Sequence, residues 1–89
     1  MIEISKQIVN SFNSRDIRYM NYVAQGLTDR QISERELITP RTLQNHLDII
    51  RRKIKKFIPE PDFYFSARLF TIFCYQFIEF LRKKKEETK

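Results

Sequence analysis

Glycine and proline are scarce in this sequence. Its 89 residues include one glycine and three prolines. An all-β fold needs many tight turns that depend on these residues, so their scarcity argues against a sheet and predicts an all-α fold. Hydrophobic residues make up 42% of the chain and charged residues 31%, the balance of a globular protein and not of a disordered one. This length suits a single small domain over residues 1–89, because two independent cores need more residues.

Cysteine and histidine occur only once each. Cys74 has no second cysteine with which to form an internal disulfide, which favours a reducing compartment such as the cytoplasm of a microbial cell. Neither Cys74 nor His46 has the neighbouring residues that a metal site or a catalytic nucleophile needs. We therefore expect no enzyme activity, no metal and no cofactor. The first residues, MIEISKQIVNSF, also lack the long apolar core of a secretory signal.

Acidic residues are outnumbered by basic ones. The chain carries 17 Lys and Arg against 11 Asp and Glu, a formal net charge of +6. An excess of this size in a small chain favours an acidic partner, either nucleic acid or anionic lipid. Many soluble domains carry a similar charge for solubility alone, so the charge by itself leaves these alternatives open.

The first part of the chain predicts two helices. Apolar residues within 1–12 suit a short lead-in helix with one apolar edge. Asn13 or Ser14 is suited to cap a second helix that runs to Gln25. Gly26, the only glycine, then stands where a positive φ closes the last carbonyls of a helix without a Cβ penalty. This glycine therefore predicts a helix end.

A further pair of helices follows, with a tight turn between them. Thr28 and Gln31 form a capping-box pattern for a helix over residues 29–36. The stretch TPRT then opens the next helix, with Thr39 as its cap and Pro40 at the first position, where the missing N–H has no partner to lose. Two short helices joined by a tight turn are the outline of a helix-turn-helix motif.

The helix that begins at Pro40 carries a single apolar stripe. Its members recur at the i, i+4, i+7, i+11 spacing of a buried helix face. They are Leu43, Leu47, Ile50 and Ile54. Beyond this helix, Pro59 and Pro61 interrupt helicity, and Asp62 is placed to cap a long last helix over residues 62–84. Four or five helices and no strand are expected.

Several short motifs lie at a distinctive spacing between Phe12 and Ile54. They are Arg15 with Asp16, AQGLTD at 24–29, IS at 32–33, ITPRTLQNHL at 38–47 and RRKI at 51–54. In these motifs the chain resembles the LuxR-type (GerE-like) helix-turn-helix domain of bacterial transcription regulators. The resemblance covers about half of the chain. It implies a DNA-binding core over residues 13–57 that regulates transcription.

The chain departs from the pattern of that family at three positions. Glu36 stands where the family usually has a buried leucine, so we expect Leu37 to fill that place. Lys55 replaces the usual glycine, which lets the helix run on towards Phe57. Asp48 lies where a basic or neutral residue often faces DNA.

The polar side of the helix after the turn is the expected reading surface. The resemblance implies that this helix enters the major groove with its first turns at the base edges. Gln44 and Asn45 carry amides suited to bidentate pairing with adenine, and Arg41 suits guanine or phosphate. Asp48 either accepts a hydrogen bond from cytosine or pairs with an arginine three or four residues later, and we favour the pairing. The expected base contacts are Arg41, Gln44, Asn45 and Asp48.

Phosphate contacts position a domain on DNA without reading its sequence. Helix N-termini offer free N–H groups and a positive dipole end, so the starts of both helices of the motif are expected at the DNA backbone. Thr28 and Thr39 act as caps whether or not they also touch phosphate. The expected phosphate contacts are Thr28, Arg30, Thr39, Thr42, His46, Arg51, Arg52 and Lys55.

The last helix is apolar around most of its circumference, more than one small core can absorb. Three explanations are open: a dimer seam, as the resemblance implies, packing under a partner domain, or attachment to a membrane. Arg68, Gln76 and Glu79 interrupt the apolar run and disfavour a membrane span. Cys74 fits as a small buried apolar residue. The expected dimer contacts are Leu69, Phe70, Phe73, Phe77 and Phe80.

Together these features predict a bacterial LuxR-type regulator that binds double-stranded DNA. We expect a homodimer on a pseudo-palindromic site, read by the helix over residues 40–55. The alternative is an adaptor that keeps the helix-turn-helix but binds a regulator or a polymerase subunit through the aromatic last helix. Asp48 and the unusual last helix favour that alternative.

Overall fold

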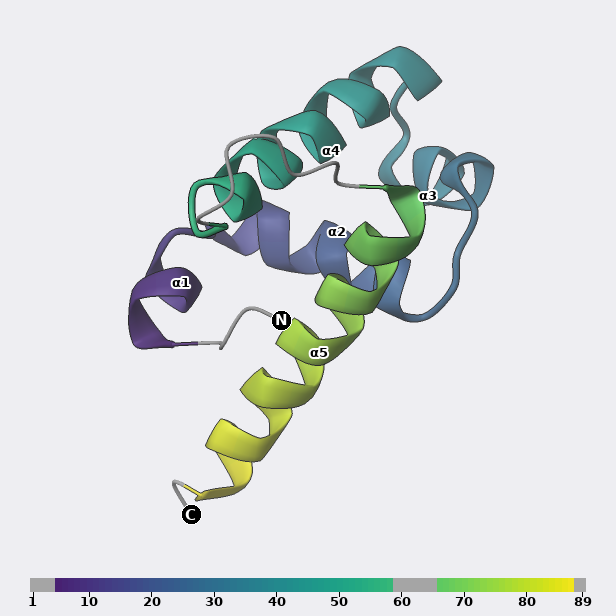
Figure 1. Cartoon of the computed structure of the whole chain (residues 1–89). Coiled ribbons are helices and arrows are strands. Elements are labelled where there is room, and N and C mark those ends of the chain that lie inside the picture. The colour runs from purple at the N-terminus through teal and green to yellow at the C-terminus, as the bar shows by residue number, and fades with distance from the viewer. Residues whose placement is uncertain (1–4, 59–65, 88–89) are drawn as a thin grey trace.

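The structure is a computed structural model that describes residues 5–58 and 66–87. Within these two ranges the chain forms five helices and no strand, which confirms the predicted all-α fold. The helices are α1 (Lys6–Asn10), α2 (Ser14–Ala24), α3 (Asp29–Glu36), α4 (Pro40–Lys55) and α5 (Ala67–Glu87). Figure 1 shows α2 in the middle, with α4 along one side and α5 crossing it, while α3 lies beside the first turns of α4.

The starts of the three central helices are capped as the sequence predicts. Asn13 Oδ1 accepts from the Asp16 backbone N–H at 2.8 Å, and the Asp16 carboxylate accepts from the Asn13 N–H at 3.1 Å. Thr28 and Gln31 form the same reciprocal box at α3. Thr39 caps α4 in front of a proline. Each cap satisfies backbone donors that a helix start leaves open, so these boundaries follow from local chemistry.

The turn after α2 needs glycine for its backbone conformation. Gly26 has φ of 84°, and a Cβ built there would meet nothing within 4 Å, so space is not the constraint. A side chain in the left-handed region costs roughly 1–2 kcal/mol. The Gly26 N–H donates to Val23 O at 3.0 Å and the Leu27 N–H donates to Tyr22 O at 3.1 Å. These bonds close α2 where the glycine predicts its end.

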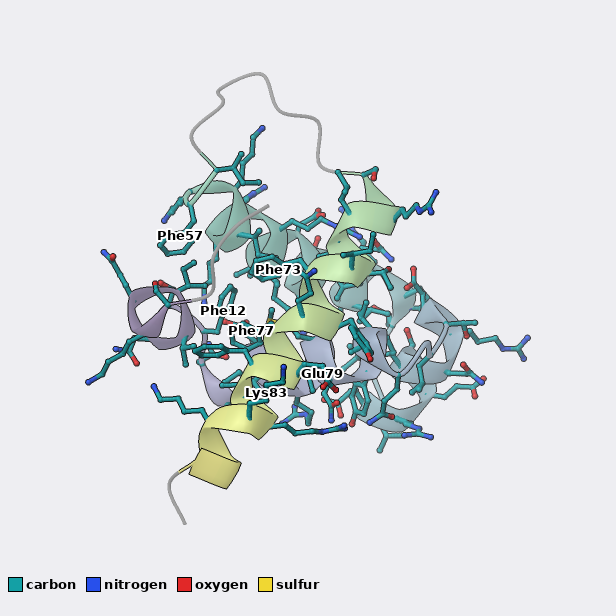
Figure 2. All side chains as sticks on the ribbon, turned by 60° about the horizontal axis from the view of Figure 1, so that its bottom comes forward. Phe12, Phe57, Phe73, Phe77, Glu79 and Lys83 are labelled. Carbon is teal, nitrogen blue, oxygen red and sulfur yellow. The ribbon has the colours of Figure 1, made fainter. Side chains whose placement is uncertain are left out.

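One hydrophobic core joins α2, α4 and α5. The α4 stripe predicted from its spacing is buried in full: Leu43, Leu47, Ile50 and Ile54. The ring of Phe12 meets Phe77 edge to face with 5.1 Å between centroids, and Figure 2 shows the two side chains together beside α5. Cys74 is fully buried, as expected, and burial raises the pKa of its thiol to about 12. This thiol is a neutral core group.

Two helix boundaries differ from the prediction. The lead-in helix is limited to α1 within the described residues, where the Ser5 side chain accepts from the Ile8 N–H. The last helix begins at Ala67 and extends to Glu87, later at both ends than residues 62–84. Ser66 is the residue at its start, and the Ser66 Oγ accepts from the Leu69 N–H at 3.2 Å. The predicted cap, Asp62, lies outside the described residues.

The prediction that Leu37 replaces a buried leucine is wrong. Leu37 is 91% exposed and has φ of 54°, because it takes the left-handed position that ends α3. Glu36 is half-buried instead, with a side chain 13% exposed. Arg18 donates to its carboxylate at 2.6 Å and the Tyr22 hydroxyl donates at 3.0 Å. An ion pair has therefore taken the place of an apolar contact between α2 and α3.

The predicted dimer contacts on α5 differ in their burial. Phe70, Phe73 and Phe77 are buried in the core of a single chain, because α5 turns this side toward α2 and α4. Leu69 stays exposed and Phe80 is half-buried. No helix in the described ranges is long and apolar enough to cross a bilayer.

Candidate nucleic-acid interface

The turn between α3 and α4 holds the two helices as one unit. The Ile38 N–H donates to Ser33 O at 3.1 Å, which closes α3 directly before the Thr39 cap of α4. Ile32, on the inner side of α3, is fully buried in the shared core. The first turns of α4 therefore lie at the edge of the molecule beside α3, as Figure 1 shows.

The outward face of α4 is unoccupied by the rest of the described chain. Arg41, Asn45 and Arg52 are exposed on the side opposite the buried stripe. Within residues 5–58 and 66–87, their side chains make no hydrogen bond or ion pair with the protein. Lys55 continues this face at the end of the helix. These groups are free to donate to an external acceptor.

Asp48 interrupts the basic face, and its partner is the one expected. Arg51 Nη1 donates to the Asp48 carboxylate at 3.1 Å, which confirms the local pairing. The Asp48 side chain is 53% exposed, so the pair contributes less than about 1 kcal/mol to stability. The Arg51 guanidinium also lies 4.6 Å from the centroid of the Phe70 ring. Arg51 is thus held between α4 and α5 and partly neutralises Asp48.

The flank of α4 toward α3 carries Gln44. Its Nε2 donates to the Asp29 carboxylate at 2.7 Å. Asp29 is the first residue of α3, so this bond ties a predicted base contact to the neighbouring helix.

The opposite flank of α4 faces α2 and has a structural role. His46 Nδ1 and the Tyr19 hydroxyl lie 3.2 Å apart, within hydrogen-bonding distance, and their rings are in contact. Lys53 Nζ donates to the buried Asp16 carboxylate at 2.5 Å. The same carboxylate caps α2, so one acidic group joins the start of α2 to α4.

The starts of α3 and α4 are exposed, as phosphate contact requires. Thr28 and Arg30 lie at the first turn of α3, where Arg30 also pairs with Glu34 at 3.1 Å in exposed surroundings. At α4, the Thr39 hydroxyl donates to Thr42 Oγ at 2.9 Å. The N-termini of α3 and α4 both direct backbone N–H groups and the positive end of the helix dipole outward.

Glu36 joins the end of α3 to α2. The hydrogen bond from Arg18 lowers the pKa of the Glu36 carboxyl, with a second contribution from the Tyr22 hydroxyl. In turn, the hydrogen bond to Glu36 raises the pKa of Tyr22. The carboxylate is therefore ionised at neutral pH and holds the end of α3 on α2.

Two residues of this surface are not among those predicted. No local sequence pattern indicates Asp29, because its hydrogen-bond partner Gln44 lies 15 positions away on another helix. Ile49 is 37% exposed on α4 although it is apolar. Its position off the i, i+4, i+7 stripe is the signal that identifies it as an outward residue, suited to contact a thymine methyl group.

Comparison with known proteins locates the same segment. A family model described as bacterial regulatory proteins, luxR family, matches residues 10–56, which is just over half of the chain. The match begins in α1 and ends directly after α4, so it contains α3, the turn and α4, and leaves out α5. No curated protein and no solved structure matches the chain.

Proposed function

The chain belongs to the luxR family of bacterial regulatory proteins, and on this premise we propose that it regulates transcription by reading a specific DNA sequence through α4. The helix-turn-helix of this family is a DNA-binding unit, and here α3 and α4 form it. Such a regulator acts in the bacterial cytoplasm.

The free outward face of α4 carries this proposal. Arg41 and Asn45 lie on the first turns, which are the part of a recognition helix that reaches base edges. Asn45 suits adenine and Arg41 suits guanine, with about 1–3 kcal/mol of discrimination for each good bidentate contact. Gln44 adds a third base contact from the flank of α4 that faces α3. Asp48 has a second carboxylate oxygen for a cytosine amino group while Oδ1 accepts from Arg51.

Phosphate contacts then hold α4 in register. Thr28 with Arg30 and Thr39 with Thr42 supply them at the starts of α3 and α4. Arg52 and Lys55 supply positive charge along α4. His46 and Arg51 contact phosphate while His46 stays against Tyr19 and Arg51 stays against Phe70. Log Kd is expected to rise with log salt by about 0.9 for each phosphate neutralised.

The second half of the proposal is a homodimer. Leu69, Ile72 and Tyr75 form an exposed apolar strip on α5, and we place the contact with a second copy there. Phe80 is half-buried further along the same helix. Two-fold symmetry predicts a pseudo-palindromic site with half-site centres about 34–36 Å apart.

A selection of random DNA duplexes on the purified protein tests base reading. Wild type is expected to enrich a motif, and Asn45→Ala is expected to lose one or more of its positions. Asn10→Ala is the matched control, because it removes the same exposed side chain from the end of α1. Enrichment of no motif, with affinity that only follows salt, would reduce the function to phosphate contact.

One observation favours a second function. The exposed strip of α5 lies outside the segment that the family model matches. An adaptor would use this strip to bind a regulator or a polymerase subunit. The double variant Gln44→Ala with Asn45→Ala separates the two functions, because a DNA reader loses its site while an adaptor keeps its partner.

A further inference from the structure

Gln44 is the predicted base contact whose amide is held by another helix. Nε2 donates to Oδ2 of Asp29 at 2.7 Å, a charge-assisted hydrogen bond between the start of α3 and the second turn of α4. The capping box of α3 uses Thr28 and Gln31 and not Asp29. The Asp29 carboxylate is therefore left free to face α4.

The chemistry of the pair decides which way the amide points. A carboxylate has only acceptor atoms, so the NH2 group of Gln44 must face it and the carbonyl oxygen must face away. A glutamine without such a partner can present either its donor or its acceptor to a base. With Asp29 in place, one orientation is favoured before DNA arrives, and less conformational freedom is lost on binding.

We propose that Asp29 is a positioning residue that determines the base preference of Gln44. Held by Asp29, Gln44 directs Oε1 outward as an acceptor. The complementary group in the major groove is a base amino group, which adenine and cytosine offer there and guanine and thymine do not. Adenine fits best, because the second N–H of Nε2 remains available for its N7. This inference rests on the proposed reading of DNA by α4.

The negative charge of Asp29 makes a distinct, opposing contribution. It lies at the start of α3, where phosphate contact is proposed, and repels phosphate whatever the base sequence. Loss of charge alone therefore strengthens binding to all duplexes alike. Loss of the hydrogen bond changes the preference at one position only. Two substitutions separate these effects: Asp29→Asn removes the charge and keeps an acceptor oxygen, whereas Asp29→Ala removes both.

The experiment measures the affinity of each protein for the best selected duplex and for its three variants at one position. That position is the one whose preference Gln44→Ala abolishes. Wild type is expected to favour adenine or cytosine there by roughly tenfold over guanine and thymine. Asp29→Ala reduces this ratio to about threefold or less and leaves the other positions unchanged. Asp29→Asn tightens binding to every duplex and keeps only part of the ratio, because its amide can turn either its oxygen or its NH2 group toward Gln44.

Asp29→Ser is a second variant. Serine is favourable at a helix start, but its side chain is too short to reach Gln44. It is expected to match Asp29→Ala, and its thermal unfolding verifies that the fold is intact. An unchanged base ratio in Asp29→Ala and Asp29→Ser overturns the inference and leaves the proposed function standing. A wild-type preference for guanine or thymine at that position overturns it too. If wild type enriches no motif at all, the proposed function fails and the inference fails with it.

Discussion

The two long helices of this molecule, α4 and α5, use their apolar residues differently. On α4 they form one stripe, so the stripe alone determines which side faces inward and leaves the other side free for a ligand. On α5 apolar residues occur on every side, and only the packing against α2 shows that Phe70, Phe73 and Phe77 face inward. In a helix with one apolar stripe, the sequence of the helix itself thus shows which side faces the core. In a helix that is apolar on every side, the packing of the rest of the fold decides it.

The largest expected effect tests the inward side of α5. Phe77→Ala is expected to lower the free energy of unfolding by about 3–5 kcal/mol, because it leaves a cavity beside Phe12. Tyr75→Ala, on the same helix but 57% exposed, is expected to change it by less than about 0.5 kcal/mol when all proteins are measured at concentrations at which they are monomeric. Urea unfolding of both variants measures the difference, and equal losses would mean that α5 is turned the wrong way.

The outward side of α5 is tested by charge. Ile72→Glu places a carboxylate in the exposed strip and is expected to raise the dimer dissociation constant at least about tenfold, because the charge would be buried without a partner. Lys84→Glu, at the end of α5, is the control and should leave the dimer intact. Sedimentation equilibrium measures both. A wild-type monomer at high micromolar concentration would refute the dimer itself.

An intermediate effect concerns the attachment of α3 to α2. The folded pKa of Glu36 is lowered from 4.5 by the Arg18 hydrogen bond, so its stabilisation is complete above that pH and is lost as pH falls through the folded pKa. Glu36→Gln is expected to lower the free energy of unfolding at pH 7 by roughly 1 kcal/mol, because half of the Arg18 side chain is exposed and solvent screens the pair. Its difference from wild type should shrink below pH 4.5.

The control for this pH dependence is Glu34→Gln, which removes an exposed carboxylate from the same helix. Urea midpoints between pH 7 and pH 3 are the measurement. A constant difference between wild type and Glu36→Gln across that range would show that the Arg18 pair contributes nothing specific.

The smallest expected effect concerns the acidic residue on α4. Asp48→Asn removes a charge that repels phosphate, and we expect tighter DNA binding by about threefold at low salt with a change in stability below about 0.5 kcal/mol. Glu79→Gln, an equal charge change on α5, should leave the affinity unaltered. Titration at two salt concentrations tests this. Weaker binding in Asp48→Asn would instead favour a cytosine contact by Asp48.

Local chemistry explains what the sequence predicts well. The caps Asn13, Thr28 and Thr39, the turn at Gly26 and the stripe of α4 depend on residues within one or two turns of each other. Such patterns are complete within a short stretch of sequence, so they predict α2, α3 and α4 nearly to the residue.

Contacts between distant residues explain what was missed. The family pattern predicts that Leu37 lies inside. Instead Glu36 turns inward, because its partners Arg18 and Tyr22 come from another helix. The bond from Gln44 to Asp29 likewise joins two helices. Neither pair has a fixed spacing along the chain, so no local pattern identifies it.

The central claim is that α4 reads base sequence, and one titration tests it most directly. The ratio of affinities for the selected duplex and for a scrambled duplex is measured at physiological salt, with wild type and with Asn45→Ala. We predict a wild-type ratio of about 10³ or more, reduced roughly tenfold in Asn45→Ala. A wild-type ratio near one, with both affinities falling together as salt rises, would contradict the claim.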